Sequence, residues 1–310
     1  MDKLNQDTSP VELLAAFGDD CLLRGMKYYQ GQLGYSREFL STLNKTKSPL
    51  EIDRSDLKAY LILLQKRNLK QTSIGKIFSA LSNFYEFLVE EELIQANPVR
   101  LFRKRYIKIY KEQVAQDVRQ LISIEDASRL VNSVLDSRNK AILVLLLKTG
   151  MRINELLALD VEDVDMIKMQ IRLKPTTKRS NRLLFFDQET EETLQNWLVA
   201  RKNRNTHGGH ALFPSKTSSR LSSHEVQREV EKHAARVGLH DPDSKLLEKR
   251  FTPHCCRHWF STHLYRAGME ERYIAWLRGD APRGSMGPYI HIDSEDVRKS
   301  YLAHVPQLGV

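Results

Sequence analysis

The stretch NKAILVLLLKTGMRINELLAL, residues 139–159, decides how this chain folds. Its first ten residues are nearly all apolar, so they predict a helix that is buried on every side. Gly150 predicts the end of that helix, because glycine readily adopts the left-handed conformation that closes a helix. Arg152 opens a second, short helical stretch, and Glu155 follows one turn later. Taken alone, such an arginine is more typical of a surface ion pair with Glu155 than of a functional site.

Composition limits the class of protein. The chain has 310 residues, of which 41% are hydrophobic and 28% charged, so it is long enough for two domains with ordinary cores. Its net charge of +9 favours an acidic partner, and nucleic acid is the most common one. Charge alone does not establish DNA binding, because many basic proteins never contact DNA.

The cysteines and the apolar runs indicate the compartment. Cys255 and Cys256 are adjacent and Cys21 stands alone, and this odd count argues against a disulfide-bridged secreted protein. The N-terminus is polar, unlike a signal peptide, and the longest apolar run, residues 141–147, is too short to span a bilayer. We expect a reduced intracellular protein, cytoplasmic or nucleoid-associated, with no membrane partner.

Periodicity and charge divide the chain into an arm, a helical module, a linker and a second domain. The expected boundaries are 1–20 for a flexible arm, 21–99 for the helical module, 100–115 for a basic linker and 116–310 for the second domain, with a C-terminal tail from about 293. In the second domain, Lys168–Lys174 and Asn181–Phe186 predict two short strands. The fold class is therefore mainly α with a small β-sheet.

The linker carries a run of bases and aromatic residues. Arg103, Lys104, Arg105 and Lys108 lie in it without a firm helical period. Such a segment can lie along DNA phosphates, so these four side chains are candidate DNA contacts. A solvated linker between two domains is the alternative.

Four residues that are far apart in the sequence carry complementary chemistry. Arg152 and Arg257 can grip phosphate oxygens in forked hydrogen bonds. His254, three residues before Arg257, can move a proton near neutral pH. Tyr289 has a hydroxyl that can attack phosphorus and hold it covalently. These residue types together can break a phosphodiester without a metal ion.

Three segments resemble the tyrosine recombinase (phage integrase) family. Residues 149–159 are similar to its first box almost residue for residue, and residues 254–264, HCCRHWFSTHL, resemble its second box. Residues 274–280, IAWLRGD, resemble the segment whose last residue precedes the family's nucleophile by nine positions. The resemblance implies that Tyr289 is the nucleophile and that Arg152, His254 and Arg257 are catalytic.

The same resemblance implies a fold and an activity. The fold is an N-terminal helical core-binding domain of the SAM-like type, followed by a C-terminal mixed α/β catalytic domain. The activity is that of a site-specific DNA recombinase that cuts and rejoins DNA through a 3′-phosphotyrosyl intermediate. No cofactor and no metal is expected. The expected partners are a double-stranded DNA target site and further copies of the chain, as a homo-tetramer on two duplexes.

The family also places a general-acid lysine in the turn between the two strands. Lys178 fits the family spacing better than Lys174, which is the second choice. Taken alone, a lysine at the tip of a hairpin is usually solvated and without function.

Asp280 is the main departure from the family, which has histidine or tryptophan at that position. An ionised carboxylate there repels the negative charge of the transition state unless it is paired or protonated. The residues that could neutralise it, or donate to the phosphate in its place, are Arg278, Arg283 and His291.

Three other functions remain open at this point. A type IB topoisomerase-like enzyme has the same chemistry but relaxes DNA without exchanging strands. A catalytically impaired DNA-binding protein of the same fold is suggested by Asp280. A metal-dependent nuclease needs clustered carboxylates, and the candidates for such a cluster are Asp160, Glu162, Asp163 and Asp165.

Overall fold

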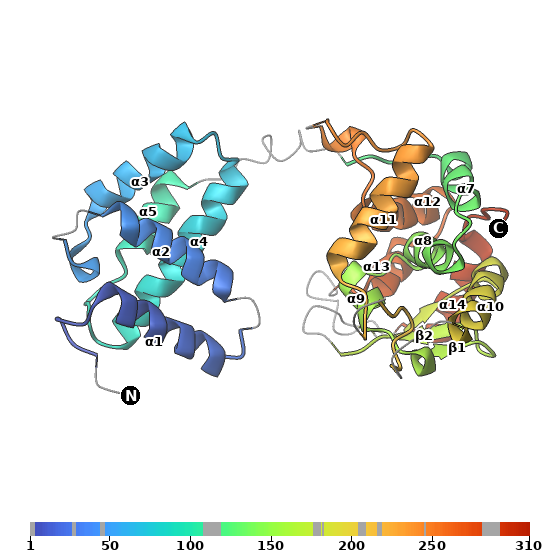
Figure 1. Ribbon diagram of the computed structural model, residues 1–310, viewed down its shortest axis with the longest axis horizontal. Coiled ribbons are helices and arrows are strands. Elements are labelled where there is room, and N and C mark those ends of the chain that lie inside the picture. Colours follow the sequence, from blue (N-terminus) through green and yellow to red (C-terminus); the bar gives the residue numbers. More distant parts are fainter. Residues whose placement is uncertain are drawn as a thin grey trace. The chain divides into compact units, whose positions relative to one another are not determined.

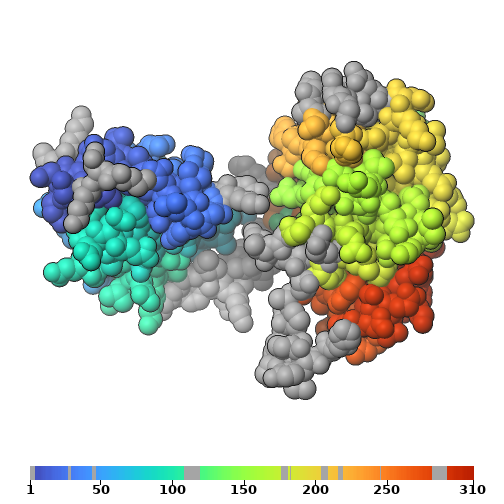
Figure 2. All heavy atoms as spheres, turned by 90° about the horizontal axis from the view of Figure 1, so that it is seen from below, coloured from blue at the N-terminus to red at the C-terminus, as the bar shows by residue number. Residues whose placement is uncertain are grey.

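A computed structural model of the chain describes most of its residues. The described ranges are 4–26, 29–43, 47–107, 119–175, 181, 183–203, 209–215, 219–244, 246–280 and 292–310. Contacts divide the chain into two compact units, Met1–Gln116 and Asp117–Val310. In Figures 1 and 2 the first unit runs from blue to blue-green and the second from green to red, so each unit is one continuous stretch of sequence.

The N-terminal unit is built from helices around the longest of them. Its described helices are α1 (Pro10–Leu23), α2 (Gln30–Thr42), the 3-10 turn η1 (Pro49–Glu51), α3 (Arg54–Lys66), α4 (Gln71–Glu90) and α5 (Pro98–Tyr106). Apolar residues recur along α4 at helical spacing and are buried. Aromatic pairs then join α4 to its neighbours: Phe84 meets Phe17 of α1 at 5.4 Å between ring centroids, and Phe78 stacks on Phe102 of α5 at 5.5 Å.

The expected arm of residues 1–20 contains a packed helix. Ser9 and Glu12 form a capping box at the start of α1, and Pro10 occupies its first turn. Leu13 and Phe17, four residues apart, are fully buried in the core of the unit. The segment is therefore part of the fold from Pro10 onward, because its apolar face has a core to cover.

The expected basic linker of residues 100–115 also begins as a helix. Phe102 of α5 is buried, so one face of the helix packs on the unit. Lys104 and Arg105 are exposed, and Arg103 donates a hydrogen bond to Ser79 Oγ at 2.6 Å. The mixture of bases and aromatic residues is thus the pattern of a short amphipathic helix. Lys108 lies outside the described residues.

The C-terminal unit surrounds helix α8. Its described helices are α7 (Ile124–Asn132), α8 (Ser137–Thr149), α9 (Ile153–Ala158), α10 (Gln188–Lys202), α11 (Ser223–Arg236), α12 (Pro253–Arg266), α13 (Glu271–Arg278) and α14 (Ser294–His304), with 3-10 turns η2 (Val161–Asp163) and η3 (Leu247–Lys249). Every residue from Ala141 to Thr149 is buried, and Figure 1 shows α8 amid the other helices. The apolar run therefore forms the central helix, as the sequence predicts.

A small antiparallel sheet lies at one edge of this unit. It consists of β1 (Val164–Asp165), β2 (Gln170–Arg172) and β3 (Leu183–Phe185), in that order. Ile171 pairs with Val164 on one side and with Leu184 on the other. The two predicted strands are present in shorter form, whereas the two-residue β1 is too short to give a periodic signal. The mainly α fold with a small sheet is confirmed.

The end of the chain is anchored to the start of α10. The Glu189 carboxylate accepts hydrogen bonds from the backbone N–H groups of Leu308, at 2.8 Å, and Gly309, at 2.5 Å. Ser128 of α7 donates to the Leu308 carbonyl at 2.5 Å, and the Leu308 side chain is buried. The tail that follows α14 is therefore part of the C-terminal unit's own core. Figure 2 shows the C-terminal part of the chain, in red, on one side of that unit.

None of the described helices combines the length and the apolar character needed to cross a lipid bilayer.

Candidate functional site

The site begins where α8 ends, at Gly150. This residue has φ +59°, in the left-handed region that glycine adopts without strain. A Cβ atom built on Gly150 overlaps the ring of Phe260 from α12. Glycine is required here on both grounds, and it lets α12 approach the end of α8 closely. This approach brings Arg152, two residues after Gly150, near to Arg257 of α12.

Arg152 is held by Glu155. The Glu155 carboxylate accepts from the Arg152 backbone N–H at 2.7 Å and from its guanidinium at 3.0 Å. Glu155 is almost fully buried, while 36% of the Arg152 side chain is exposed. The ion pair expected from the sequence therefore exists. It is not a surface pair of two exposed side chains, because the buried Glu155 carboxylate orients the partly exposed Arg152 guanidinium.

Arg257 is buried and is bound by the carboxyl ends of two helices. Its guanidinium donates to the Gly150 carbonyl at 2.6 Å and to the Arg278 carbonyl, the last of α13, at 2.8 Å. Carbonyls at helix ends carry partial negative charge, so they stabilise a buried cation. Burial, together with the charges of Arg152 and Arg278, lowers the pKa of Arg257 to about 10, so it is still protonated at neutral pH.

The two arginines converge on one carboxylate. Asp280 Oδ1 lies 3.4 Å from an Arg257 nitrogen and 3.7 Å from an Arg152 nitrogen. The Asp280 Oδ2 atom faces Arg278, with 3.1 Å between Oδ2 and Arg278 Nε. Arg152 and Arg257 thus approach a single anion position from two sides. Asp280 is paired, as an ionised carboxylate at this position requires, and Arg278 is one of the residues expected to neutralise it.

His254 lies in the first turn of α12, three residues before Arg257, and its side chain is exposed. Partial desolvation by its neighbours, then the charges of Arg119, Arg257 and His258, lower its pKa below the ordinary 6.5. The imidazole is therefore neutral at pH 7 and able to accept a proton.

Lys174 is bound in an ion-pair cluster. Its Nζ lies 3.1 Å from Asp160 Oδ2 and 3.0 Å from Asp163 Oδ2, and these two carboxylates raise its pKa. A lysine held in this way keeps its proton and is poorly suited to give it to a leaving group. Lys178, the first choice, lies outside the described residues.

The strand that follows Lys178 in the sequence is tied to α13. Asn181 donates to the Trp276 carbonyl, and the Phe185 ring of β3 stacks on the Trp276 ring at 6.1 Å. Two residues after Trp276, α13 ends at Arg278. The start of β3 is therefore fixed beside the helix end that holds Arg257.

Tyr289 lies outside the described residues. The flanking elements α13 and α14 share one hydrophobic cluster with Phe260 and Leu264 of α12. Tyr301, another tyrosine downstream of Arg257, is fully buried in α14 and donates to the Lys148 carbonyl at 2.9 Å. Burial also raises its pKa well above the ordinary value. Tyr301 is therefore a packing residue with no access to a substrate.

Two of the four carboxylates considered for a metal site, Asp160 and Asp163, are neutralised by bases. Asp160 pairs with Arg220 as well as with Lys174, and Asp163 pairs with Lys174. Within the described ranges, no group of three or more histidine, cysteine, aspartate or glutamate side chains could hold a metal ion. The acidic run that follows α9 therefore forms an ion-pair cluster.

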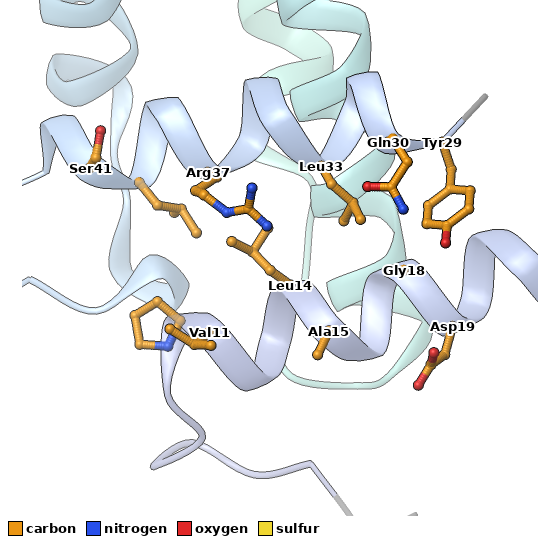
Figure 3. Close-up of a pocket in the computed structure, with 12 residues that line it drawn as sticks. Val11, Leu14, Ala15, Gly18, Asp19, Tyr29, Gln30, Leu33, Arg37 and Ser41 are labelled. Atoms are coloured by element: carbon orange, nitrogen blue, oxygen red, sulfur yellow. The ribbon is translucent and has the colours of Figure 1, made fainter.

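Two surface hollows lie among the described residues of the N-terminal unit. One, of about 570 Å³, lies between α2, α4 and α5 and is lined by the predicted DNA contact Arg103 together with Lys76 and the amides of Gln32 and Asn83. The other, of about 550 Å³, lies between α1 and α2, and Figure 3 shows side chains of both helices facing it, among them Leu14 and Leu33. Both hollows expose more apolar than polar surface, and the first places two bases and two amides at its wall.

Several residues that shape the site were missed from the sequence. The carbonyls of Gly150 and Arg278 bind Arg257, and Arg119 contributes to the low pKa of His254. The helix-stop glycines Gly150 and Gly279 were the available signal, because a left-handed stop leaves carbonyls exposed at the helix end.

Comparisons with known proteins agree with this geometry. Residues 114–295 match the model of the phage integrase family, and residues 25–92 match that of the phage integrase N-terminal SAM-like domain. The tyrosine recombinase XerC of Pelotomaculum thermopropionicum is 27% identical over 303 residues, which cover 92% of this chain and 90% of that protein. The XerC of Bacillus subtilis is 27% identical over 264 residues, 81% of each chain.

Solved structures share the fold. A lambda integrase dimer bound to a COC′ core site has a TM-score of 0.64 at 18% identity, covering 94% of this chain and 77% of that one. The Tn1549 transposon integrase in complex with circular intermediate DNA has a TM-score of 0.62 at 19% identity, covering 93% of this chain and 98% of that one.

Proposed function

The chain belongs to the phage integrase family and is a site-specific recombinase of the tyrosine type, and on this premise we propose that Tyr289 cuts and rejoins double-stranded DNA. The observation that carries the proposal is the convergence of Arg152 and Arg257 on one anion position. A scissile phosphodiester bound there has its two non-bridging oxygens gripped by two guanidiniums.

The arginines act most strongly in the transition state. Negative charge on the non-bridging oxygens grows as the nucleophile adds to phosphorus, and donors that are already in place stabilise it without reorganising. Arg257 is preorganised by two helix ends and Arg152 by Glu155. The pocket is therefore built for a phosphorus-centred transition state.

The bonds and protons of the cleavage step balance without a cofactor. The Tyr289 oxygen forms a bond to phosphorus while the bond from phosphorus to the 5′ oxygen breaks, which leaves a 3′-phosphotyrosyl link. His254 accepts the tyrosine proton, as its low pKa allows. Lys178 donates a proton to the leaving 5′ oxygen, a role to which the paired Lys174 is poorly suited. Attack by the 5′ hydroxyl of another strand then reverses the step and exchanges the strands.

Both units contribute to the DNA complex that we propose. The residues from 21 to 99 form the core-binding domain, and those from 116 to 310 form the catalytic domain. The exposed bases Lys104 and Arg105 on α5, with Arg103 in the neighbouring hollow, contact backbone phosphates. Four copies of the chain assemble on two duplexes, so that each strand to be exchanged has its own nucleophile.

The alternatives are less well supported. The curated relatives that match along most of their length are recombinases, which does not favour a topoisomerase. Impairment of the site was suggested by Asp280, yet its charge is balanced by Arg278 and both phosphate-gripping arginines are in place.

The direct test is the substitution Tyr289→Phe. A nicked duplex that loses its 5′ hydroxyl fragment after cleavage traps the covalent adduct, which is then seen as a slower band on a denaturing gel. We expect an adduct with the natural chain and none with Tyr289→Phe, while the two bind the duplex equally. Tyr273→Phe serves as the control and keeps the adduct, because Tyr273 lies on α13 beside Arg272. An adduct formed by Tyr289→Phe contradicts the assignment.

A further inference from the structure

We infer that, in the absence of DNA, the Asp280 carboxylate occupies the position between Arg152 and Arg257 where the DNA phosphate binds. The carboxylate leaves this position when the phosphate binds. The inference rests on the proposed function, because it concerns the same pair of arginines. It makes Asp280 a positioning residue: it keeps the two guanidiniums together while DNA is absent, and it competes with every anion that enters the pocket.

The backbone fixes where the Asp280 side chain starts. Gly279 closes α13 in the left-handed conformation, with φ +65°. The backbone N–H of Asp280 then donates to the Ala275 carbonyl at 3.0 Å, which completes the last turn of the helix. The carboxylate is therefore delivered to the pocket by a defined helix end, next to the Arg278 carbonyl that binds Arg257.

The two carboxylate oxygens have different partners. Oδ1 faces the phosphate-gripping arginines at 3.4 and 3.7 Å, whereas Oδ2 faces Arg278 at 3.1 Å. Charge-assisted hydrogen bonds are strongest at about 2.7–2.9 Å, so the contacts of Oδ1 are loose. Arg278 Nε is the nearest guanidinium nitrogen to Asp280 and forms an ion pair with Oδ2, whereas Arg257 donates a long hydrogen bond to Oδ1. The ion pair of Oδ2 with Arg278 can persist while Oδ1 leaves the other two arginines.

The charges suit an exchange of one anion for another. A carboxylate and a phosphodiester each carry one negative charge, and both present oxygens to a guanidinium fork. Among the described residues, three guanidiniums face two carboxylates here, those of Glu155 and Asp280. The described guanidiniums outnumber the described carboxylates, so an incoming phosphodiester is attracted to the pocket while Asp280 stays paired with Arg278.

Binding of inorganic phosphate to the DNA-free chain tests the inference without any activity. We expect Asp280→Asn, which keeps the shape and removes the charge, to bind phosphate about tenfold more tightly than the natural chain, a gain of about 1.4 kcal/mol. The control is Asp126→Asn, which removes a carboxylate from an exposed ion pair with Arg129 on α7 and leaves phosphate affinity unchanged. Equal or weaker binding by Asp280→Asn overturns the inference.

Thermal unfolding gives a second readout. In buffer free of phosphate and sulfate, Asp280→Asn should melt below the natural chain, because the guanidiniums have lost their shared anion. Added phosphate should raise its melting temperature more than that of the natural chain. A variant that melts at the same temperature and gains no more from phosphate than the natural chain contradicts a role for Asp280 in holding the arginines.

Arg278→Gln tests whether the Asp280 carboxylate moves onto Arg278 when phosphate binds. In the natural chain this change should weaken phosphate binding several-fold, because Asp280 loses its alternative partner. In the Asp280→Asn background the effect should be much smaller, since neighbours that act together are not additive. If Arg278→Gln weakens phosphate binding equally in the two backgrounds, Asp280 does not move onto Arg278.

The two proposals fail separately. If the natural chain forms the Tyr289 adduct but Asp280→Asn binds phosphate no more tightly, the function stands and the inference falls. If phosphate binding behaves as expected but no adduct forms, the anion exchange stands and the recombinase chemistry of Tyr289 falls.

Discussion

Lys148 and Arg152 are both cations that face two carboxylates in the C-terminal unit, but their surroundings differ. Lys148 is fully buried, and its Nζ lies 2.5 Å from Asp187 and 2.6 Å from Glu189. Arg152 is 36% exposed, 3.0 Å from Glu155 and 3.7 Å from Asp280. The first cluster has more carboxylates than cations, whereas the second also includes Arg257 and Arg278 and so has more cations.

This difference separates a structural ion cluster from a binding site. The Lys148 cluster joins the end of α8 to the start of α10 and, through Glu189, to the chain terminus. Its short contacts leave no place for a further ligand. The arginine cluster has longer contacts, access to solvent and a surplus of positive charge, so an incoming anion gains by joining it.

The largest effect on stability is expected at Lys148. Lys148→Met leaves the carboxylates of Asp187 and Glu189 buried without their cation, which should cost about 3–5 kcal/mol of unfolding free energy. The control is Lys174→Met, because Lys174 also pairs with two carboxylates but is 39% exposed. Its loss should cost about 1 kcal/mol or less. Urea denaturation measures both, and equal losses remove the distinction between the two clusters.

At Arg152 we expect a larger effect on activity than on stability, the reverse of Lys148. Arg152→Gln should slow adduct formation by about 10²–10³-fold, as the loss of one preorganised donor to a transition state does. Its unfolding free energy should fall less than that of Lys148→Met, because Arg152 is 36% exposed and glutamine keeps an N–H donor for Glu155. Arg129→Gln, which breaks an exposed ion pair of the same spacing on α7, should leave the rate unchanged. A large loss of stability with a normal rate identifies Arg152 as structural.

Gly150 lies between the Lys148 cluster and the arginine cluster. Its substitution should lower the unfolding free energy by an intermediate amount. Gly150→Ala places a methyl group against the Phe260 ring at a positive φ, at a cost of about 2 kcal/mol. Gly238→Ala is the matched control, since Gly238 has φ +76° and nothing within 4 Å of an added Cβ. It isolates the backbone strain, about 1 kcal/mol. Adduct formation should fall only for Gly150→Ala, because only that change separates α8 from α12.

The smallest effect is expected from acidification. The pKa of His254 is lowered, so the imidazole is neutral at pH 7 and becomes protonated only as the pH falls through this lowered pKa. The rate of adduct formation should therefore change little between pH 8 and 7 and should fall, approaching tenfold per pH unit, as the pH drops below the lowered pKa of His254. His254→Gln should be slower throughout and should lose this acid limb. A midpoint of the fall above pH 6.5, or an acid limb that persists in His254→Gln, contradicts the role of His254 as base.

The elements that the sequence predicted correctly are those with a strong local pattern. The apolar run of α8 and the two strands β2 and β3 each carry a pattern that can be recognised from neighbouring residues. Helix α5 was missed because bases surround its narrow apolar face, and α1, although mostly apolar, was missed because it lies in the segment expected to be an arm. Their helical state depends on a core that other segments supply, Phe17 meeting Phe84 and Phe102 meeting Phe78.

By itself the sequence determined that residues 141–149 are buried, where α8 stops and which residue types are available for phosphate chemistry, because each of these follows from local pattern and side-chain chemistry. Only the tertiary structure decided that Arg152 and Arg257 meet at one anion position and that Asp280 lies in it. Those distances join side chains of three helical segments. They depend on how closely α12 approaches the end of α8, and that approach is set by the packing of Phe260 against Gly150, not by any pattern along the chain.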